Sequence, residues 1–154
     1  MNKVLITGGS GLLGSRLTDL LLLNGYDVWH LSRNTHKNNY KQTYYWNINN
    51  KKIDANALDN TAYIIHLAGA GVVEKKWTQG YKQEIIDSRV KSQEFLWEEC
   101  IRKGLKLKGY FSASGINYYG SDTGDRINTE QDIPGSEYIA EVVIKWEEAA
   151  KKFQ

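Results

Sequence analysis

Hydrophobic residues along this chain occur in short runs separated by longer amphipathic or polar segments. The first run, Val-Leu-Ile at 4–6, is uninterrupted and is followed at once by glycines. This pattern is typical of a strand buried on both faces of a parallel sheet. Aliphatic, aromatic or β-branched runs at 27–31, 43–48, 62–68 and 108–114 predict four further strands.

The segments between these runs show helical periodicity. A helix is expected to run to residue 23, where Asn24-Gly25 supplies a C-terminal stop. Its apolar face is expected to consist of Leu13, Leu17, Leu20, Leu21 and Leu23. Two more amphipathic helices are expected over 80–104 and 138–153.

The alternation of strands and helices predicts the α/β class and a single domain over residues 1–154. We expect a Rossmann-like, doubly wound parallel sheet with right-handed crossovers and the strand order 3-2-1-4-5. Such folds usually contain a sixth strand, and no segment here supplies one. The fifth strand is therefore expected to have an unpaired edge, which favours self-association such as a homodimer.

Composition narrows the functional classes. The chain has 154 residues, of which 25% are charged and 41% hydrophobic, as in ordinary globular domains. The net charge of +2, with acids and bases mixed, gives no indication of nucleic-acid or membrane binding. The single cysteine, Cys100, is expected to pack in the core, and the apolar runs are too short for a signal peptide or a membrane span. We therefore expect a cytoplasmic protein.

A glycine-rich segment between the first strand and helix carries the strongest functional signal. Thr7-Gly8-Gly9-Ser10-Gly11-Leu12-Leu13-Gly14 contains the spacing G-x-G-x-x-G, counted from Gly9. We expect Gly9 to permit the tight turn, Gly11 to let a pyrophosphate approach the backbone, and Gly14 to let helix and strand pack closely. The N–H groups at the start of the helix would then face the phosphates. This context predicts a dinucleotide site.

The residues at the end of the second strand indicate which dinucleotide is bound. Enzymes that select NAD usually place an acid here to hold the ribose 2′-hydroxyl, but no acid occurs between Asp27 and Asp54. Ser32 offers a hydroxyl instead, and Arg33 offers a planar cation that matches a 2′-phosphate. We therefore favour NADP(H) over NAD(H). The alternative is that Arg33 is a solvated loop cation.

Other polar positions are weaker candidates. His66 lies inside an apolar strand and is expected to be a packed residue rather than a catalytic base. The asparagine-rich patches at 34–39 and 47–50 are expected to be solvated loops. The sequence predicts no metal site.

Several short motifs give the chain a family resemblance. Besides the glycine segment they are Leu67-Ala68-Gly69, Trp77-Thr78, Asp87-Ser88-Arg89-Val90, Ser112-Ala113-Ser114, Tyr118-Tyr119-Gly120 and Trp146-Glu147. With these motifs the chain resembles the extended, nucleotide-sugar-epimerase-like branch of the short-chain dehydrogenase/reductase superfamily. It is most similar to an atypical subgroup named epimerase family proteins. The resemblance covers essentially the whole chain, which looks like the N-terminal half of a member without the C-terminal substrate-binding lobe.

The resemblance implies roles for individual residues. Ser114 stands at the serine position that holds the reacting oxygen, and Tyr138 stands where the catalytic tyrosine is expected. The lysine that should follow four residues later is replaced by Val142. Without that cation a tyrosine, with an ordinary pKa of about 10, is a poor base at neutral pH. Arg89 stands where extended members often carry an asparagine, and it is a candidate cation.

These observations define the expected site. The residues expected to contact the dinucleotide are Gly8, Gly9, Ser10, Gly11, Leu12, Leu13, Gly14, Ser32, Arg33, Leu67, Ala68, Gly69 and Arg89, and the expected catalytic residues are Ser114 and Tyr138. Alternatively, Ser114 satisfies a turn and Tyr138 packs as a core aromatic. The expected function is an NADP(H)-binding oxidoreductase or epimerase acting on a small carbonyl or nucleotide-sugar substrate. The alternative is a dinucleotide-binding module with little catalysis, in a sensor or assembly role.

Overall fold

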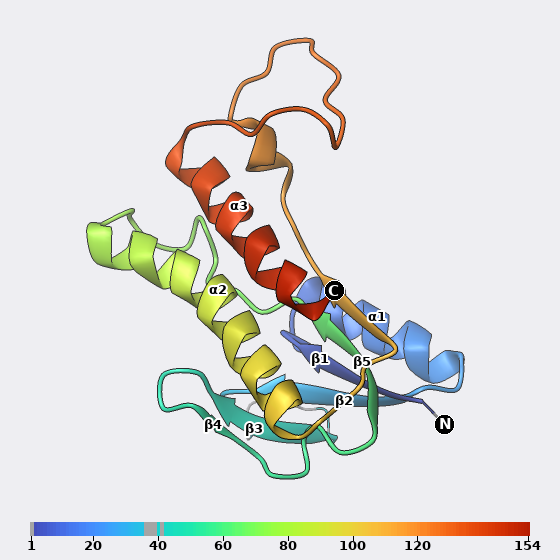
Figure 1. Ribbon diagram of the computed structural model, residues 1–154. Coiled ribbons are helices and arrows are strands. Elements are labelled where there is room, and N and C mark those ends of the chain that lie inside the picture. The colour runs from blue at the N-terminus through green and yellow to red at the C-terminus, as the bar shows by residue number, and fades with distance from the viewer. Residues whose placement is uncertain (1, 36–39, 41) are drawn as a thin grey trace.

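The chain folds into one six-stranded sheet with helices on both faces, as a computed structural model shows (Figure 1). The structure describes residues 2–35, 40 and 42–154. The strands are β1 (Lys3–Thr7), β2 (Asp27–Ser32), β3 (Thr43–Asn47), β4 (Lys52–Ile53), β5 (Thr61–His66) and β6 (Gly109–Ser112). The helices are α1 (Leu12–Leu23), α2 (Gln79–Arg102) and α3 (Tyr138–Ala150), with short 3₁₀ segments η1 (Ile116–Tyr119) and η2 (Lys151–Phe153).

The sheet has the order β4-β3-β2-β1-β5-β6. The five predicted strands are β1, β2, β3, β5 and β6, and all their pairings are parallel, which confirms the fold class and the order 3-2-1-4-5. β4 was not predicted. It pairs antiparallel with β3 through two residues only, and so short a strand leaves no periodic pattern in the sequence.

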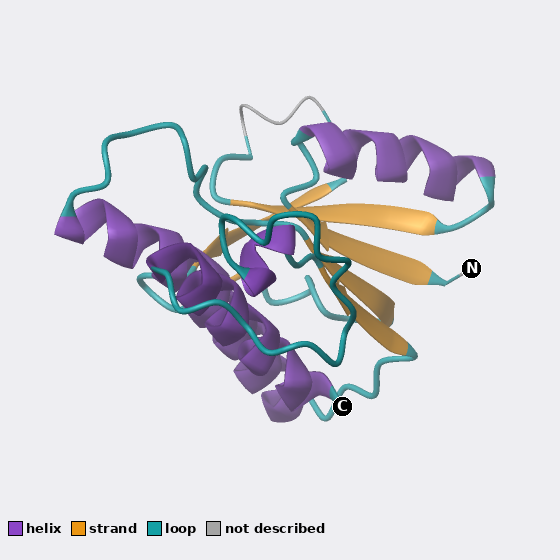
Figure 2. Ribbon diagram, turned by 90° about the horizontal axis from the view of Figure 1, so that it is seen from above, coloured by secondary structure: helices purple, strands orange, loops and turns teal. Residues whose placement is uncertain are grey.

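The layers follow from where the apolar residues lie. α1 covers one face of the sheet, and α2 and α3 cover the other (Figure 2). The larger core lies between the sheet and α2, where Leu5 and Ile64 pack with Leu96. A smaller core on the α1 side contains Val4 and Ile6.

The predicted apolar face of α1 is confirmed at Leu21 and is wrong at Leu13, Leu20 and Leu23. The buried residues of this helix are Gly14 and Thr18, and Leu21 packs beside them against the smaller core. Leu13, Leu20 and Leu23 are exposed, with Leu23 at 83%. Leucines occur on most sides of this helix, so hydrophobicity alone does not fix which side faces the sheet. The small side chains at positions 14 and 18 decide it. Gly14 lets the helix approach the glycine turn, and the Thr18 hydroxyl contacts Nε2 of His30 on β2 at 2.8 Å.

Two predicted core residues are confirmed. Cys100 is buried on α2, and burial raises the pKa of its thiol to about 12. His66 is fully buried, and burial lowers its pKa to about 3, so the ring is neutral at physiological pH. Within the described residues, no helix is both long and apolar enough to cross a membrane.

Candidate functional site

The glycine turn joins β1 to α1, and most of its glycines are required by contacts inside the protein. Gly8 adopts the left-handed conformation, with φ of 70°, and a Cβ there would lie 2.9 Å from the carbonyl carbon of Leu67. A Cβ on Gly14 would lie 2.4 Å from the carbonyl oxygen of Gly8. The expected role of Gly9 needs correction, because Gly8 rather than Gly9 holds the left-handed position. Gly9 is small because a Cβ there would lie 2.5 Å from the ring of His30.

Gly11 differs from the other three glycines of the turn. Its φ of −77° is open to any residue, and the nearest atom to an added Cβ is the carbonyl oxygen of Gly8, at 3.3 Å. A shift of a few tenths of an ångström would relieve that contact. The fold itself therefore has little need for glycine here, and the approach of a ligand to the backbone explains it better.

The start of α1 is suited to bind an anion. Gly11 is the N-cap and has no side chain to accept a hydrogen bond, and the first turn of the helix contains no acidic residue. The first N–H groups of a helix have no acceptor within it, and the helix dipole adds partial positive charge there. A phosphate group supplies both the acceptor and the negative charge.

Thr7 connects this turn to the end of β5. Its buried hydroxyl oxygen accepts hydrogen bonds from the backbone N–H of Leu67 at 3.2 Å and of Ala68 at 3.1 Å. The glycine turn and the predicted Leu67-Ala68-Gly69 segment are thereby held side by side at the carboxyl edge of the sheet.

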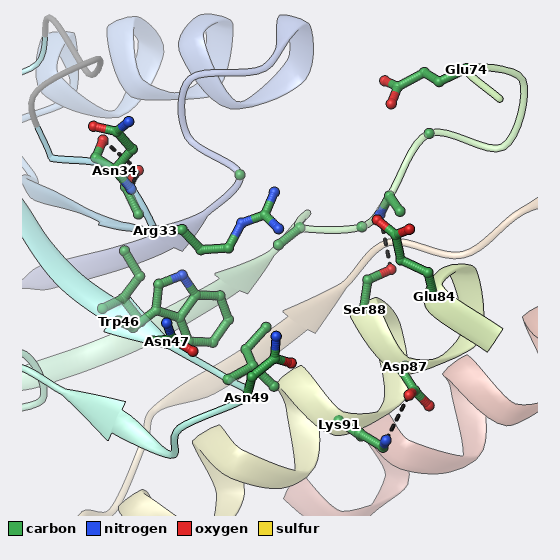
Figure 3. Close-up of a pocket in the computed structure, with 18 of the residues that line it drawn as sticks. Arg33, Asn34, Trp46, Asn47, Asn49, Glu74, Glu84, Asp87, Ser88 and Lys91 are labelled. Carbon is green, nitrogen blue, oxygen red and sulfur yellow. Dashed lines mark hydrogen bonds and ion pairs between the residues drawn. The ribbon is translucent and has the colours of Figure 1, made fainter. Parts of the chain in front are cut away.

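A groove of about 920 Å³ runs along this edge (Figure 3). Its volume lies within the range of small-molecule and cofactor sites. The predicted site residues that line it are Gly8, Gly9, Ser10, Ser32, Arg33, Ala68 and Gly69. The predicted residues that do not line it are Gly11, Leu12, Leu13, Gly14, Leu67, Arg89, Ser114 and Tyr138.

Arg33 extends into the groove from the end of β2 (Figure 3). Within the described part of the chain, its guanidinium has no hydrogen-bond or ion-pair partner. The neighbouring Ser32 hydroxyl donates to the carbonyl oxygen of Asn34 at 3.0 Å and accepts from the Asn34 N–H at 3.1 Å. This local turn fixes the backbone from which Arg33 projects and leaves the cation available for a ligand.

Sequence reasoning missed two walls of the groove. The end of β3 contributes one, with Trp46, Asn47 and Asn49. Residues 48–50 form a turn with Asn49 and Asn50 exposed, as expected for this patch, but its position beside the groove was not predicted. Asn34 also lines the groove, whereas residues 36–39 of the other asparagine-rich patch lie outside the described residues. The position of residues 47–49 at the carboxyl end of a parallel strand was the available signal. The second wall is formed largely by α2 and includes Glu84 and Asp87, which form ion pairs with Lys75 and Lys91.

Arg89 lies just behind the groove and holds the segment that follows β5. Its Nη1 donates to the carbonyl oxygen of Ala70 at 3.0 Å, and its guanidinium lies over the ring of Trp146, 5.0 Å from the ring centre. A Cβ on Gly69 would lie 2.9 Å from Cζ of Arg89, so this packing requires glycine at position 69. Burial lowers the pKa of Arg89, but an arginine stays charged in proteins.

Ser114 lies at the carboxyl edge of the sheet, two residues after β6 ends. Its hydroxyl donates to Oε1 of Glu147 on α3. Both residues line a smaller cavity of about 360 Å³ with Tyr110 and Phe153. The predicted catalytic serine is thus hydrogen-bonded to the carboxylate of the Trp146-Glu147 motif.

Tyr138 begins α3 and is directed against α2. Its hydroxyl donates to the carbonyl oxygen of Lys82 at 2.7 Å. Burial raises the pKa of this hydroxyl, and the nearby Arg89 cation opposes that change only in part. Val142 is buried, and Lys145 forms an ion pair with Glu141 at 2.6 Å. Neither residue therefore supplies the cation that the tyrosine would need as a base.

His66 contributes to packing at the end of β5. Ser92 donates its own hydroxyl proton to backbone carbonyl oxygens of α2, so the 2.8 Å contact between them places a proton on Nε2 of His66. Within the described residues, Nδ1 has no hydrogen-bond partner.

A comparison with known families agrees with this geometry. The profile of the NAD dependent epimerase/dehydratase family matches residues 4–146, which is nearly the whole chain. The chain belongs to this family.

Individual members of the family show the same relationship. An epimerase family protein of Mycobacterium bovis is 30% identical over 151 residues, which are 98% of this chain and 48% of that protein. The solved nucleoside-diphosphate sugar epimerase of Corynebacterium glutamicum is 32% identical, with a TM-score of 0.79, over 99% of this chain and 31% of its own. MoeE5, solved with UDP-glucose and NAD, is 25% identical, with a TM-score of 0.78, over 99% of this chain and 49% of its own.

This family member therefore spans about half the length of the curated relatives it matches. The matched part contains the glycine turn, the groove and α3. The expected resemblance to epimerase family proteins, over their N-terminal half, is confirmed.

Proposed function

We propose that this chain is the NADP(H)-binding part of an oxidoreductase or epimerase that acts on a small carbonyl or nucleotide-sugar substrate. The observation that carries the proposal is the groove at the carboxyl edge of the sheet, into which Arg33 projects beside the glycine turn. Among the described residues the Arg33 guanidinium has no ion-pair partner. Two features support the binding of a pyrophosphate at the start of α1. The fold has little need for a glycine at position 11, and no side chain caps the helix there.

The residues fit a dinucleotide in three parts. The backbone from Gly8 to Gly14 would hold the pyrophosphate, and Ser32 with Arg33 would hold the adenosine 2′-phosphate. Leu67, Ala68 and Gly69, which Arg89 supports from behind, would accept the nicotinamide end. When bound, the dinucleotide supplies hydride transfer. Ser114 and Tyr138 would hold and move the proton on the substrate oxygen.

The substrate class rests on the family and on one similar protein. The Corynebacterium glutamicum protein, 32% identical, is described as a nucleoside-diphosphate sugar epimerase. We propose a substrate of the same class here.

Calorimetric titration of the 154-residue chain with NADPH, and separately with NADH, tests the cofactor. Binding of NADPH at least about tenfold tighter than NADH is expected, because only NADPH carries the phosphate that pairs with Arg33. Arg33→Ala should weaken NADPH binding and leave NADH binding unchanged. If neither dinucleotide binds, the proposal is overturned.

A second candidate function is a dinucleotide-binding module with little catalysis. It is favoured by the Tyr138 hydroxyl, which donates to the carbonyl oxygen of Lys82, and by Val142, which stands where the lysine partner is expected. Ser114→Ala distinguishes the two. It should abolish turnover of carbonyl or nucleotide-sugar substrates with NADPH if the protein is an enzyme, whereas a binding module has no such turnover to lose.

A further inference from the structure

Residues 70–72, which follow β5, are held in place through three successive carbonyl oxygens. From 70 to 72 these oxygens accept, in order, from Nη1 of Arg89, the hydroxyl of Tyr81 and Nε1 of Trp77. Arg89 and Tyr81 belong to α2, and Trp77 lies two residues before it. The first N–H of the segment also donates to Oγ of Ser88 on α2, at 2.9 Å (Figure 3). These four bonds fix the orientation of the peptide groups in the segment.

The fixed carbonyl groups decide where the neighbouring N–H groups point. In a trans peptide the C=O and N–H bonds point in opposite directions. The N–H of Gly71 shares a peptide with the carbonyl bonded to Arg89, and the N–H of Val72 shares one with the carbonyl bonded to Tyr81. Both N–H groups therefore point away from these two side chains. Within the described part of the chain, neither has a hydrogen-bond acceptor.

The same segment forms part of the groove wall with almost bare backbone. Gly69, Ala70 and Gly71 line the groove, and together their side chains amount to one methyl group. A ligand can therefore approach the backbone closely here. The proposed function places the nicotinamide end of the dinucleotide at Leu67, Ala68 and Gly69, directly before this segment. The nicotinamide half carries ribose hydroxyls and a carboxamide oxygen, all of which accept hydrogen bonds.

Two of the anchoring positions are also close to Tyr138, the expected catalytic tyrosine. The rings of Trp77 and Tyr138 meet edge to face, with their centres 5.3 Å apart. The Tyr138 hydroxyl donates to the carbonyl oxygen of Lys82, the residue after Tyr81. One set of contacts therefore fixes both the groove wall and the tyrosine, so that binding need not order either of them.

We propose that Trp77, Tyr81 and Arg89 are positioning residues for the nicotinamide half of the dinucleotide. By holding the carbonyl groups of 70–72, they direct the N–H groups of Gly71 and Val72 toward the acceptor oxygens of that half. This inference rests on the proposed function, because it requires a dinucleotide in the groove. None of the three side chains needs to touch the ligand itself.

Calorimetric titration with two ligands tests this role. NADPH contains the nicotinamide half, and adenosine 2′,5′-bisphosphate lacks it but keeps the phosphate expected to pair with Arg33. Tyr81→Phe and Trp77→Phe each remove one anchoring donor and keep an aromatic ring. Each should weaken NADPH binding about threefold to tenfold and leave binding of the bisphosphate unchanged. Trp77 is 43% exposed, so its variant should fold even if the buried Tyr81 proves sensitive, and circular dichroism checks both.

Tyr110→Phe is the matched control. It removes a tyrosine hydroxyl that donates to Oε1 of Gln93 at 2.7 Å, and Tyr110 does not line the groove. Its affinity for both ligands should equal that of the unaltered chain. The positioning role is overturned if Tyr81→Phe and Trp77→Phe bind NADPH as tightly as Tyr110→Phe, or if they lose affinity for both ligands by the same factor. If neither ligand binds the unaltered chain, the proposed function itself fails.

Discussion

The glycines of the turn separate into those required by the fold and one that a ligand would require. Gly8, Gly9 and Gly14 each leave less than 3 Å between an added Cβ and the nearest atom of the protein. Gly11 leaves 3.3 Å and has an ordinary backbone conformation. Stability and dinucleotide binding should therefore respond to substitution at different positions of one short motif.

We predict that Gly11→Ala folds but binds NADPH at least about tenfold more weakly, because the new methyl group occupies the path of the pyrophosphate. Its cost in the free energy of unfolding should stay within about 1 kcal/mol, as for other N-cap changes. Gly14→Ala should instead cost roughly 1–3 kcal/mol or more, because its methyl group meets backbone atoms that cannot move freely. Urea unfolding and calorimetry measure the two effects. Equal losses of stability in the two variants would contradict this division.

His66 should make stability depend on pH. Its folded pKa of about 3 lies below its ordinary value of 6.5. Between these values the unfolded chain binds more protons than the folded one. The contribution of His66 to stability is therefore complete above about pH 6.5 and decreases as the pH falls toward 3.

The slope from this one residue can reach about 1.4 kcal/mol per pH unit over that range. Urea unfolding at several pH values between 7 and 4 should show it as a falling free energy of unfolding. The variant His66→Gln has no group that titrates there, so its curve should be flatter by the same slope. A parallel dependence in both proteins would assign the effect to carboxyl groups instead.

The connection between β1 and β5 shows how one buried hydroxyl positions two elements. The Ala68 N–H is bonded to the hydroxyl oxygen of Thr7, and Leu67 donates both to this oxygen and to the Thr7 carbonyl oxygen. This connection sets the spacing between the glycine turn and the opposite side of the groove. It belongs to the framework of the site, because Thr7 itself does not line the groove.

We predict that Thr7→Val lowers the free energy of unfolding by roughly 1–3 kcal/mol, because the shape is kept while the Ala68 N–H loses its acceptor. Thr7→Ser keeps the hydroxyl and is the matched control, with a smaller loss. Thermal unfolding of both variants measures the difference. Equal stability of Thr7→Val and the unaltered chain would show that these hydrogen bonds contribute no net stability.

The sequence was sufficient to predict those elements whose burial requires a continuous run of apolar residues. Central parallel strands such as β1 and β5 are of this kind, and their order followed from the handedness of the crossovers. The orientation of α1 could not be predicted, because leucines surround it and the small residue Thr18 decides the packing. The two-residue β4 was too short to leave a pattern. Contacts such as the hydrogen bond between Ser114 and Glu147 could not be predicted either, because they join residues far apart in the sequence and leave no local pattern.

The groove exists only in the folded molecule, because its walls come from the ends of β1, β2, β3 and β5 and from α2. A dinucleotide that binds there should therefore bind the folded state alone. Binding of this kind stabilises the folded state by mass action, at about 2.7 kcal/mol when the ligand is present at 100 times its Kd. For a chain of 154 residues this corresponds to an increase in Tm of about 5–10 °C.

The increase in Tm should therefore differ between NADPH and NADH at equal concentrations, and Arg33 should cause the difference. NADPH should raise Tm more than NADH, because only its 2′-phosphate can form a charge-assisted pair with the guanidinium. In Arg33→Ala the two dinucleotides should raise Tm equally, whereas Arg33→Lys should keep part of the difference as a point charge. Such equality already in the unaltered chain would mean that Arg33 does not select the cofactor and that the glycine turn alone provides the affinity.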